Sequence, residues 1–261
     1  MFLIVKLLKK GQKIHKSDYK TFLILAFFEP LCYFLGESFG LSMNVSSTIA
    51  SVIIATIPVF TPIAAYFTVK EKLTPLNYFG LFISFVGVLA MVINNDFSFS
   101  ADPLGVLLLF FAVLSAMFYA VFIKKLAHKY NAFTILTYQN LIGAIYFLPL
   151  FLIFDFGHFI SIEPNLELIT ALLQLSVFAS TLAFLLYIPV VRDLGITKAN
   201  IFTNFIPVFT AIFSYFILSE VLTFNKIVGM LIVIAGVLLT QIGNIVNMGK
   251  NYLNKREKRR R

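Results

Sequence analysis

Long runs of apolar residues recur along the whole chain and are separated by short polar segments. A helix crosses the hydrocarbon of a bilayer with roughly 20 consecutive apolar residues. The runs that meet or approach this length predict eight spans: 21–41, 45–67, 76–94, 103–124, 130–154, 166–190, 197–218 and 223–245. The second span is interrupted by Pro58 and Pro62, which are tolerated where neighbouring helices satisfy the freed carbonyls. The pattern therefore predicts an all-α, polytopic membrane helix bundle.

Two stretches of this pattern are copies of each other. Residues 57–89 align without a gap to residues 206–238, and 16 of the 33 positions are identical. Both copies open with Ile-Pro-Val-Phe-Thr, and each matching pair lies 149 residues apart. The shared pairs include Pro58/Pro207, Glu71/Glu220, Gly80/Gly229 and Gly87/Gly236. The chain therefore contains an internal duplication, which is typical of membrane transporters.

Composition and charge add an orientation to the predicted spans. Hydrophobic residues make up 59% of the chain and charged residues only 13%, which excludes a water-soluble domain. Of the 21 Lys and Arg residues, 20 fall on one side of the spans, and only Lys226 lies opposite. The positive-inside rule then places both termini in the cytoplasm, with 1–20 and 246–261 as basic segments at the cytoplasmic membrane. The net charge of +9 is thus mostly a topology signal and does not indicate nucleic acid as a partner. A solvated basic tail is the favoured interpretation, and contact of the tail with membrane lipids is the alternative.

This topology makes the duplication an inverted one. The span 45–67 runs from outside to inside, whereas its counterpart 197–218 runs from inside to outside. Inverted repeats are typical of carriers in which one half rocks against the other around a site near the bilayer midplane. The alternative is that the duplication only enlarges a scaffold.

Four sequence features of the two copies resemble a known family. In each copy an Ala precedes a Pro by eight residues, at Ala50 and Pro58 in the first copy and at Ala199 and Pro207 in the second, and a Tyr follows each Pro by eight residues. A Glu closes each of these spans, and the next span carries a G-x-x-x-x-x-x-G-V motif. Over nearly the whole chain, these features resemble the EamA-type carriers of the drug/metabolite transporter superfamily. The resemblance implies a transporter built from inverted repeats.

The same resemblance implies ten spans arranged as five plus five. Here the second repeat, 103–245, contains five predicted spans, whereas the first, 21–95, contains three. Two further spans are therefore expected before residue 21. A start codon placed too late is the favoured explanation, and a natural truncation or an eight-span variant are the alternatives. Residues 1–14 can also be interpreted as an amphipathic helix at the membrane surface.

Two carboxylates lie inside the first span, where a charge is costly unless it is paired or hydrated. Glu29 lies near mid-span, and Pro30 next to it is expected to kink the helix. On an unbroken helix Glu37 lies roughly 80° from Glu29, and Tyr33 falls between them on the same face. We interpret Glu29 as a proton-coupling or cation-binding group, with a neutral structural carboxylic acid as the alternative. For Glu37 the two interpretations are evenly balanced.

Uncharged polar residues in other spans complete a predicted solute cavity with aromatic walls. These substrate-binding candidates are Tyr119, Gln139, Asn140, Tyr187 and Asn204. Each of them can instead hydrogen-bond a neighbouring helix. The repeated Glu71 and Glu220 are predicted to cap helices and shape hairpins rather than to contact solute. The repeated glycines, spaced seven residues apart, are predicted to allow close helix packing.

The sequence argues against several other chemistries. The single Cys32 forms no intramolecular disulfide, no Cys/His spacing indicates a metal, and neither an ATP-binding loop nor an enzyme motif is present. We therefore expect a secondary transporter without cofactors that moves a small metabolite or drug-like solute, in the direction of export and with proton exchange through Glu29. A non-transporting scaffold or sensor, an inactive truncated carrier and a lipid flippase are the alternatives, and a homodimer is left open.

Overall fold

Helices dominate the computed structural model, which describes residues 11–60, 63, 74–93, 100–194, 199 and 205–258. Six helical runs are long and apolar enough to cross a membrane: Lys16–Ser42, Pro75–Val92, Pro103–Ala127, Ala132–Ser161, Leu166–Asp193 and Phe224–Ile242. Two shorter apolar helices, Ser47–Phe60 and Ile206–Ile217, carry the repeated prolines. Together they follow the eight predicted spans in order, so the predicted all-α membrane bundle is confirmed. Parts of the predicted spans 45–67 and 197–218 lie outside the described residues.

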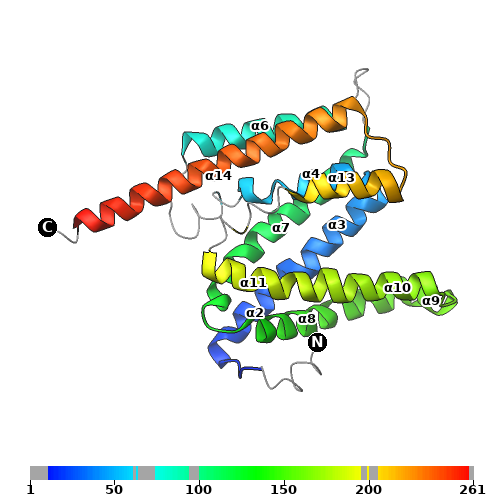
Figure 1. The fold of residues 1–261 in the computed structure, drawn as a ribbon. Coiled ribbons are helices and arrows are strands. Elements are labelled where there is room, and N and C mark those ends of the chain that lie inside the picture. Colours follow the sequence, from blue (N-terminus) through cyan, green and yellow to red (C-terminus); the bar gives the residue numbers. More distant parts are fainter. Residues whose placement is uncertain are drawn as a thin grey trace. The chain divides into compact units, whose positions relative to one another are not determined.

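The chain divides into two compact units. The first unit is Met1–Cys32 with Phe122–Ile196, and the second is Tyr33–Val121 with Thr197–Arg261. The helices of the first unit are η1 (Lys16–Asp18), α2 (Tyr19–Ala26), η2 (Phe27–Cys32), α8 (Ala132–Leu150), η3 (Phe151–Asp155), α9 (Phe156–Ser161), α10 (Leu166–Gln174), η4 (Leu175–Leu182) and α11 (Ala183–Leu194). Both α2 and α11 pack on α8. In Figure 1, α8–α9 and α10–α11 form two long rods.

The segment that precedes α2 is fastened to the beginning of α8 by a polar cluster. Asp18 is buried, and its carboxylate accepts hydrogen bonds from the Lys129 ammonium at 2.7 Å and from the Tyr130 hydroxyl at 2.8 Å. The His15 N–H donates to the same Tyr130 oxygen at 3.1 Å. The hydrogen bond to Asp18 raises the pKa of Lys129, so this pair is charged at neutral pH.

Replacing Asp18 with asparagine should loosen this cluster. The amide keeps one acceptor oxygen but loses the charge that holds Lys129, and hydrogen bonds to charged groups contribute about 1.5–3 kcal/mol each. Limited trypsin digestion of the purified protein should then cleave after Lys13 and Lys16 several times faster than in the wild type. Cleavage at an unchanged rate would show that the cluster does not hold this segment.

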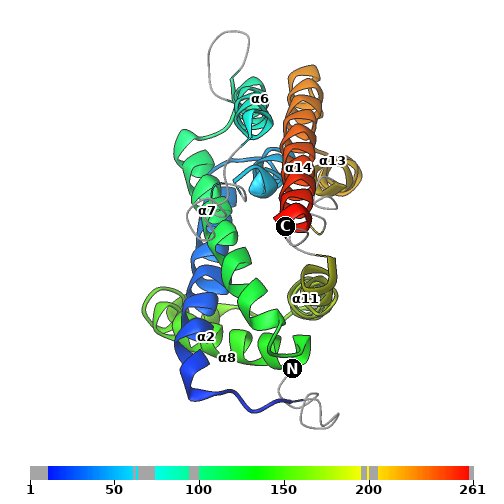
Figure 2. The same cartoon turned by 90° about the vertical axis from the view of Figure 1, so that its left-hand side faces the viewer.

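The second unit contains α3 (Tyr33–Ser42), α4 (Ser47–Ile54), α6 (Pro75–Val92), most of α7 (Pro103–Ala127), α13 (Ile206–Ile217) and α14 (Phe224–Lys258). α3 packs closely on α7, since a Cβ atom at Gly36 would lie 2.8 Å from the Leu108 carbonyl oxygen. α13 packs on α4, and α14 runs along α6, as Figures 1 and 2 both show. Side chains of α4, α6, α7 and α14 form the apolar core of this unit.

The contact between α6 and α14 is reciprocal. A Cβ atom at Gly80 would lie 2.5 Å from the Gly236 carbonyl oxygen, and one at Gly229 would lie 2.7 Å from the Gly87 carbonyl oxygen. Gly80 and Gly229 are repeat equivalents, and so are Gly87 and Gly236. Exchanging the two repeats therefore exchanges the two contacts, which is the property of an interface with two-fold symmetry. The geometry agrees with an inverted duplication.

A second repeated residue has a clear local role. Thr74 is the N-cap of α6 and accepts a hydrogen bond from the Asn77 N–H at 3.3 Å. Its equivalent, Thr223, accepts from the Lys226 N–H at 3.4 Å at the beginning of α14. Each threonine thereby satisfies a backbone donor that the first helical turn leaves unpaired. The two repeats use the same cap but differ three residues later, where Asn77 is replaced by Lys226.

Candidate functional site

Glu29 lies at a break in the first membrane helix. Within the run Lys16–Ser42 its backbone is extended, with φ −145° and ψ 117°, directly before Pro30. A residue that precedes proline is biased away from helical geometry, and proline itself donates no backbone hydrogen bond. The predicted kink is thus confirmed. The Glu29 residue is only 6% exposed, so the break holds a carboxyl group away from the surface.

Helix α8 packs against this break through a face of small and polar residues. Gly143 lies directly against Pro30, and a Cβ atom at Gly143 would collide with the proline ring. Gln139 precedes Gly143 by one turn on the same helix face and is 2% exposed. Asn140 is its partly buried neighbour. The predicted candidates Glu29 and Gln139 therefore belong to two elements that pack together in the first unit.

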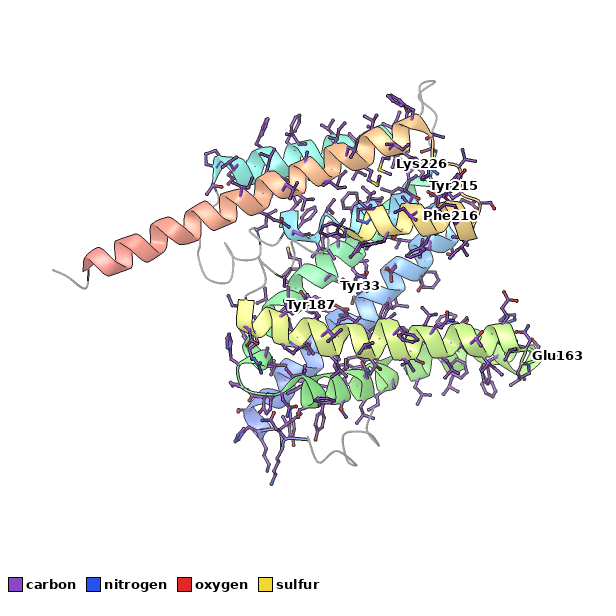
Figure 3. The ribbon with its side chains drawn as sticks, in the orientation of Figure 1. Tyr33, Glu163, Tyr187, Tyr215, Phe216 and Lys226 are labelled. Atoms are coloured by element: carbon purple, nitrogen blue, oxygen red, sulfur yellow. The ribbon has the colours of Figure 1, made fainter. Side chains whose placement is uncertain are left out.

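Tyr187 of α11 joins these residues. Its hydroxyl lies within electrostatic range of the Glu29 carboxylate, and α11 packs on α8; Figure 3 labels Tyr187 on its helix. We call Glu29, Gln139 and Tyr187 the Glu29 site. A buried carboxyl group at a helix break, within electrostatic range of a tyrosine hydroxyl, can hold a proton, or a cation in its charged form. This combination is suited to coupling and solute recognition.

Three other candidates lie in the second unit. The Tyr33 hydroxyl donates to Glu37 Oε1 at 3.0 Å, so these two residues share one face of α3 as predicted. The backbone at Glu29 is extended, so the helix is broken at that residue. The angle of roughly 80° between Glu29 and Glu37 assumes an unbroken helix and therefore does not apply. Tyr119 is buried on α7, and the candidate Asn204 lies outside the described residues.

The predicted structural residues fall at contacts between helices. Pro58 is buried in the apolar helix Ser47–Phe60, and Pro207 is buried in the first turn of α13. The carboxylate of Glu220 accepts from the Lys226 ammonium at 2.9 Å, while its repeat equivalent Glu71 lies outside the described residues. The contacts of Glu220 support the predicted capping role.

The electrostatics of Glu220 follow from its partners. Besides Lys226, it accepts a hydrogen bond from the Thr48 N–H at 3.3 Å and one from the Ser46 hydroxyl. Burial by itself raises the pKa of this carboxyl, but the hydrogen bonds from Lys226, Ser46 and Thr48 outweigh it and lower the pKa below its usual value. Glu220 is therefore charged at neutral pH.

Three residues at these contacts were not singled out from the sequence: Asp18, Ser46 and Thr48. For Ser46 a signal exists, because a serine directly before an apolar helical run is a typical N-cap. Its hydroxyl oxygen does accept from the Ile49 N–H at 3.4 Å. Asp18 gives no comparable signal, because its partner Lys129 lies 111 positions away. Among the described residues, no three His, Cys, Asp or Glu side chains are grouped to hold a metal ion.

Comparison with known proteins places this sequence among membrane transporters. A sequence model of the EamA-like transporter family matches residues 1–93 and 103–242. An uncharacterized transporter of Archaeoglobus fulgidus is 31% identical over 198 residues, which cover 75% of this chain and 67% of that protein. The uncharacterized transporter YetK of Bacillus subtilis is 25% identical over 246 residues, covering 93% and 74% respectively. One solved crystal structure aligns with a TM-score of 0.64 at 14% identity, over 91% of this chain and 82% of its own, and shows the fold alone.

Proposed function

We propose that this chain, which belongs to the EamA-like transporter family and is therefore a membrane transporter, moves a small organic solute by alternating access. The two repeats, 21–95 and 103–245, are the halves that move against each other. The reciprocal packing of Gly80 on Gly236 and of Gly229 on Gly87 supports this division. Repeats related in this way present equivalent surfaces to both sides of the membrane, which is what alternating access requires.

The buried Glu29 at the helix break is the observation that carries the coupling proposal. Inside a membrane an ionisable side chain persists where it binds an ion, a proton or a solute. Tyr187 lies within electrostatic range of Glu29, and the buried Gln139 lies one turn before the Gly143 that packs on Pro30. Both side chains are neutral, so protonation of Glu29 leaves the site without a charge. Solute would then leave the cell in exchange for protons that enter through Glu29.

The orientation follows from the charge distribution. Both termini lie in the cytoplasm, and the protein resides in the cytoplasmic membrane, because 20 of the 21 Lys and Arg residues fall on one side of the spans. The substrate is a small metabolite or drug-like molecule. A carboxylate in the cavity favours cationic or zwitterionic solutes, although the same carboxylate also binds the coupling proton.

The test is a comparison of intracellular and medium metabolite profiles in cells that lack the gene and cells that express it. We expect a small group of chemically related compounds to move from the cells to the medium on expression. Their efflux should increase when the medium is made more acidic, because the inward proton gradient becomes steeper. Unchanged profiles, with the protein confirmed in the membrane, would contradict the proposal.

A further inference from the structure

Glu220 connects the two repeats within the second unit. It lies in the turn between α13 and α14 of the second repeat, whereas its partner Thr48 lies in α4 of the first repeat, 172 positions away. Figure 3 labels Lys226 at the beginning of α14, and Tyr215 and Phe216 near the end of α13. The side chains of Glu220 and Lys226 are only 11% and 14% exposed. One carboxylate therefore holds three helix ends together.

The geometry at α4 explains why a carboxylate fits there. The first turn of a helix leaves backbone N–H groups unpaired and carries a partial positive charge. Ser46 satisfies the Ile49 N–H, and Glu220 from the other repeat satisfies the Thr48 N–H. Helix α4 thus has one cap from its own repeat and a second, charged cap from the other.

The ion pair is the asymmetric part of this arrangement. The repeat equivalent of Lys226 is Asn77, whose side-chain amide donates to the Thr240 carbonyl oxygen at 3.1 Å. Lys226 is also the one basic residue on the predicted outer side of the spans. The second repeat has therefore placed a cation where the first repeat has a neutral amide, and that cation binds Glu220.

The two connections between the repeats differ in kind. Along α6 and α14 the backbones are in direct contact, so these helices cannot separate without losing apolar packing. The Glu220 contacts are polar and lie at the helix ends, where water can replace each partner when they separate. The first connection suits a fixed pivot, and the second suits a contact that opens and closes.

We propose that Glu220 and Lys226 form a latch, which closes the outer ends of α4, α13 and α14 and must open in each transport cycle. This inference rests on the proposed alternating access. The structure holds the latch closed, with the Glu220 carboxylate accepting hydrogen bonds from the Thr48 N–H and from the Lys226 ammonium.

The first test measures opening without any solute. Thr48 is 1% exposed, and Thr48→Cys keeps the backbone N–H that donates to Glu220, so this small substitution is a conservative probe. In a Cys32→Ser background, maleimide labelling of this cysteine in purified protein should be slow. Glu220→Gln should accelerate it about tenfold or more, because a charged cap is lost. Lys226→Asn, which installs the residue of the first repeat, should give a smaller increase.

A buried control separates opening from unfolding. A cysteine at Ser115, which is 4% exposed on α7 of the second unit, should stay protected in all three backgrounds, because only unfolding would expose it. Equal protection of the Thr48 cysteine with and without Glu220→Gln and Lys226→Asn would overturn the latch. Since this assay requires no substrate, its outcome is independent of the proposed transport activity.

The second test locks the latch. Ser46 and Glu220 hydrogen-bond each other, and a cysteine is shorter than a glutamate, so the pair Ser46→Cys and Glu220→Cys, again without Cys32, can be joined by a short bifunctional methanethiosulfonate reagent, whose disulfide bonds are reducible. Cross-linking should stop transport, and reduction should restore it, whereas a contact with only a structural role would tolerate the bond. Full transport by the cross-linked protein would overturn the inference. Altered Thr48 labelling in a protein that moves no solute would instead leave the latch standing and contradict the proposed function.

Discussion

Replacing Glu29 with glutamine should abolish proton-driven transport while leaving the protein folded and inserted. Glutamine has nearly the same volume and can still hydrogen-bond its surroundings, but it cannot take up or release a proton. Glu29 is 6% exposed in the helix break, where Gly143 packs against Pro30 and Tyr187 lies near the carboxylate. Since the substitution removes a charge from a buried position, the fold should tolerate it.

The measurement is solute uptake into vesicles that contain the purified protein, with and without an imposed pH gradient. Uptake by the Glu29→Gln variant should not respond to the gradient and should fall to the level of empty vesicles. Glu163→Gln is the matched control, because Glu163 is an exposed carboxylate in the connection between α9 and α10. It should behave as the wild type does. Gradient-driven uptake of normal rate in Glu29→Gln would refute the coupling role.

Several features of the fold were predictable because they depend on local sequence. The apolar length of each span and the 149-residue offset between the copies can be counted along the chain. The break at Glu29 follows from the covalent geometry of Pro30, and the shared face of Tyr33 and Glu37 follows from helical spacing. For the break and for the shared face, the physical cause lies within a few residues of the effect.

The site itself depends on contacts that spacing along the chain does not encode. Glu29 and Gln139 were predicted separately, but their packing through Pro30 and Gly143 becomes visible only when α8 is placed against the break. Likewise the repeat singled out Glu220, but only the structure assigns its carboxylate to Thr48 in the other repeat. A duplicated sequence shows which residues of the two repeats are equivalent. It does not show which surfaces of the two repeats pack against each other.

Gly80→Ala should cause the largest loss of stability among small substitutions in the second unit. The added methyl group would meet the Gly236 carbonyl oxygen at 2.5 Å and the Thr240 backbone nitrogen at 2.8 Å. Backbone atoms cannot rotate away as side chains do, so α6 and α14 must separate. Overpacking of this kind costs about 1–3 kcal/mol, and we expect a value near the upper end. Thermal unfolding in detergent should show a clearly lower midpoint.

The control for this prediction is Gly157→Ala. A Cβ atom at Gly157 meets nothing within 4 Å, and alanine is favoured over glycine inside a helix by about 1 kcal/mol, so this variant should be as stable as the wild type or slightly more stable. Gly236→Ala should destabilise the protein as Gly80→Ala does, because its methyl group would lie 2.6 Å from the Ser84 backbone nitrogen.

The double variant Gly80→Ala with Gly236→Ala tests whether the two glycines act on one interface. Since each methyl group forces apart the same pair of backbones, the separation caused by the first makes room for the second. The combined loss of stability should therefore be smaller than the sum of the two single losses, with a coupling of roughly 0.5–3 kcal/mol. Strict additivity would mean that each glycine is needed for its own helix rather than for the contact. In that case the packed pair α6–α14 would not be the fixed pivot between the repeats.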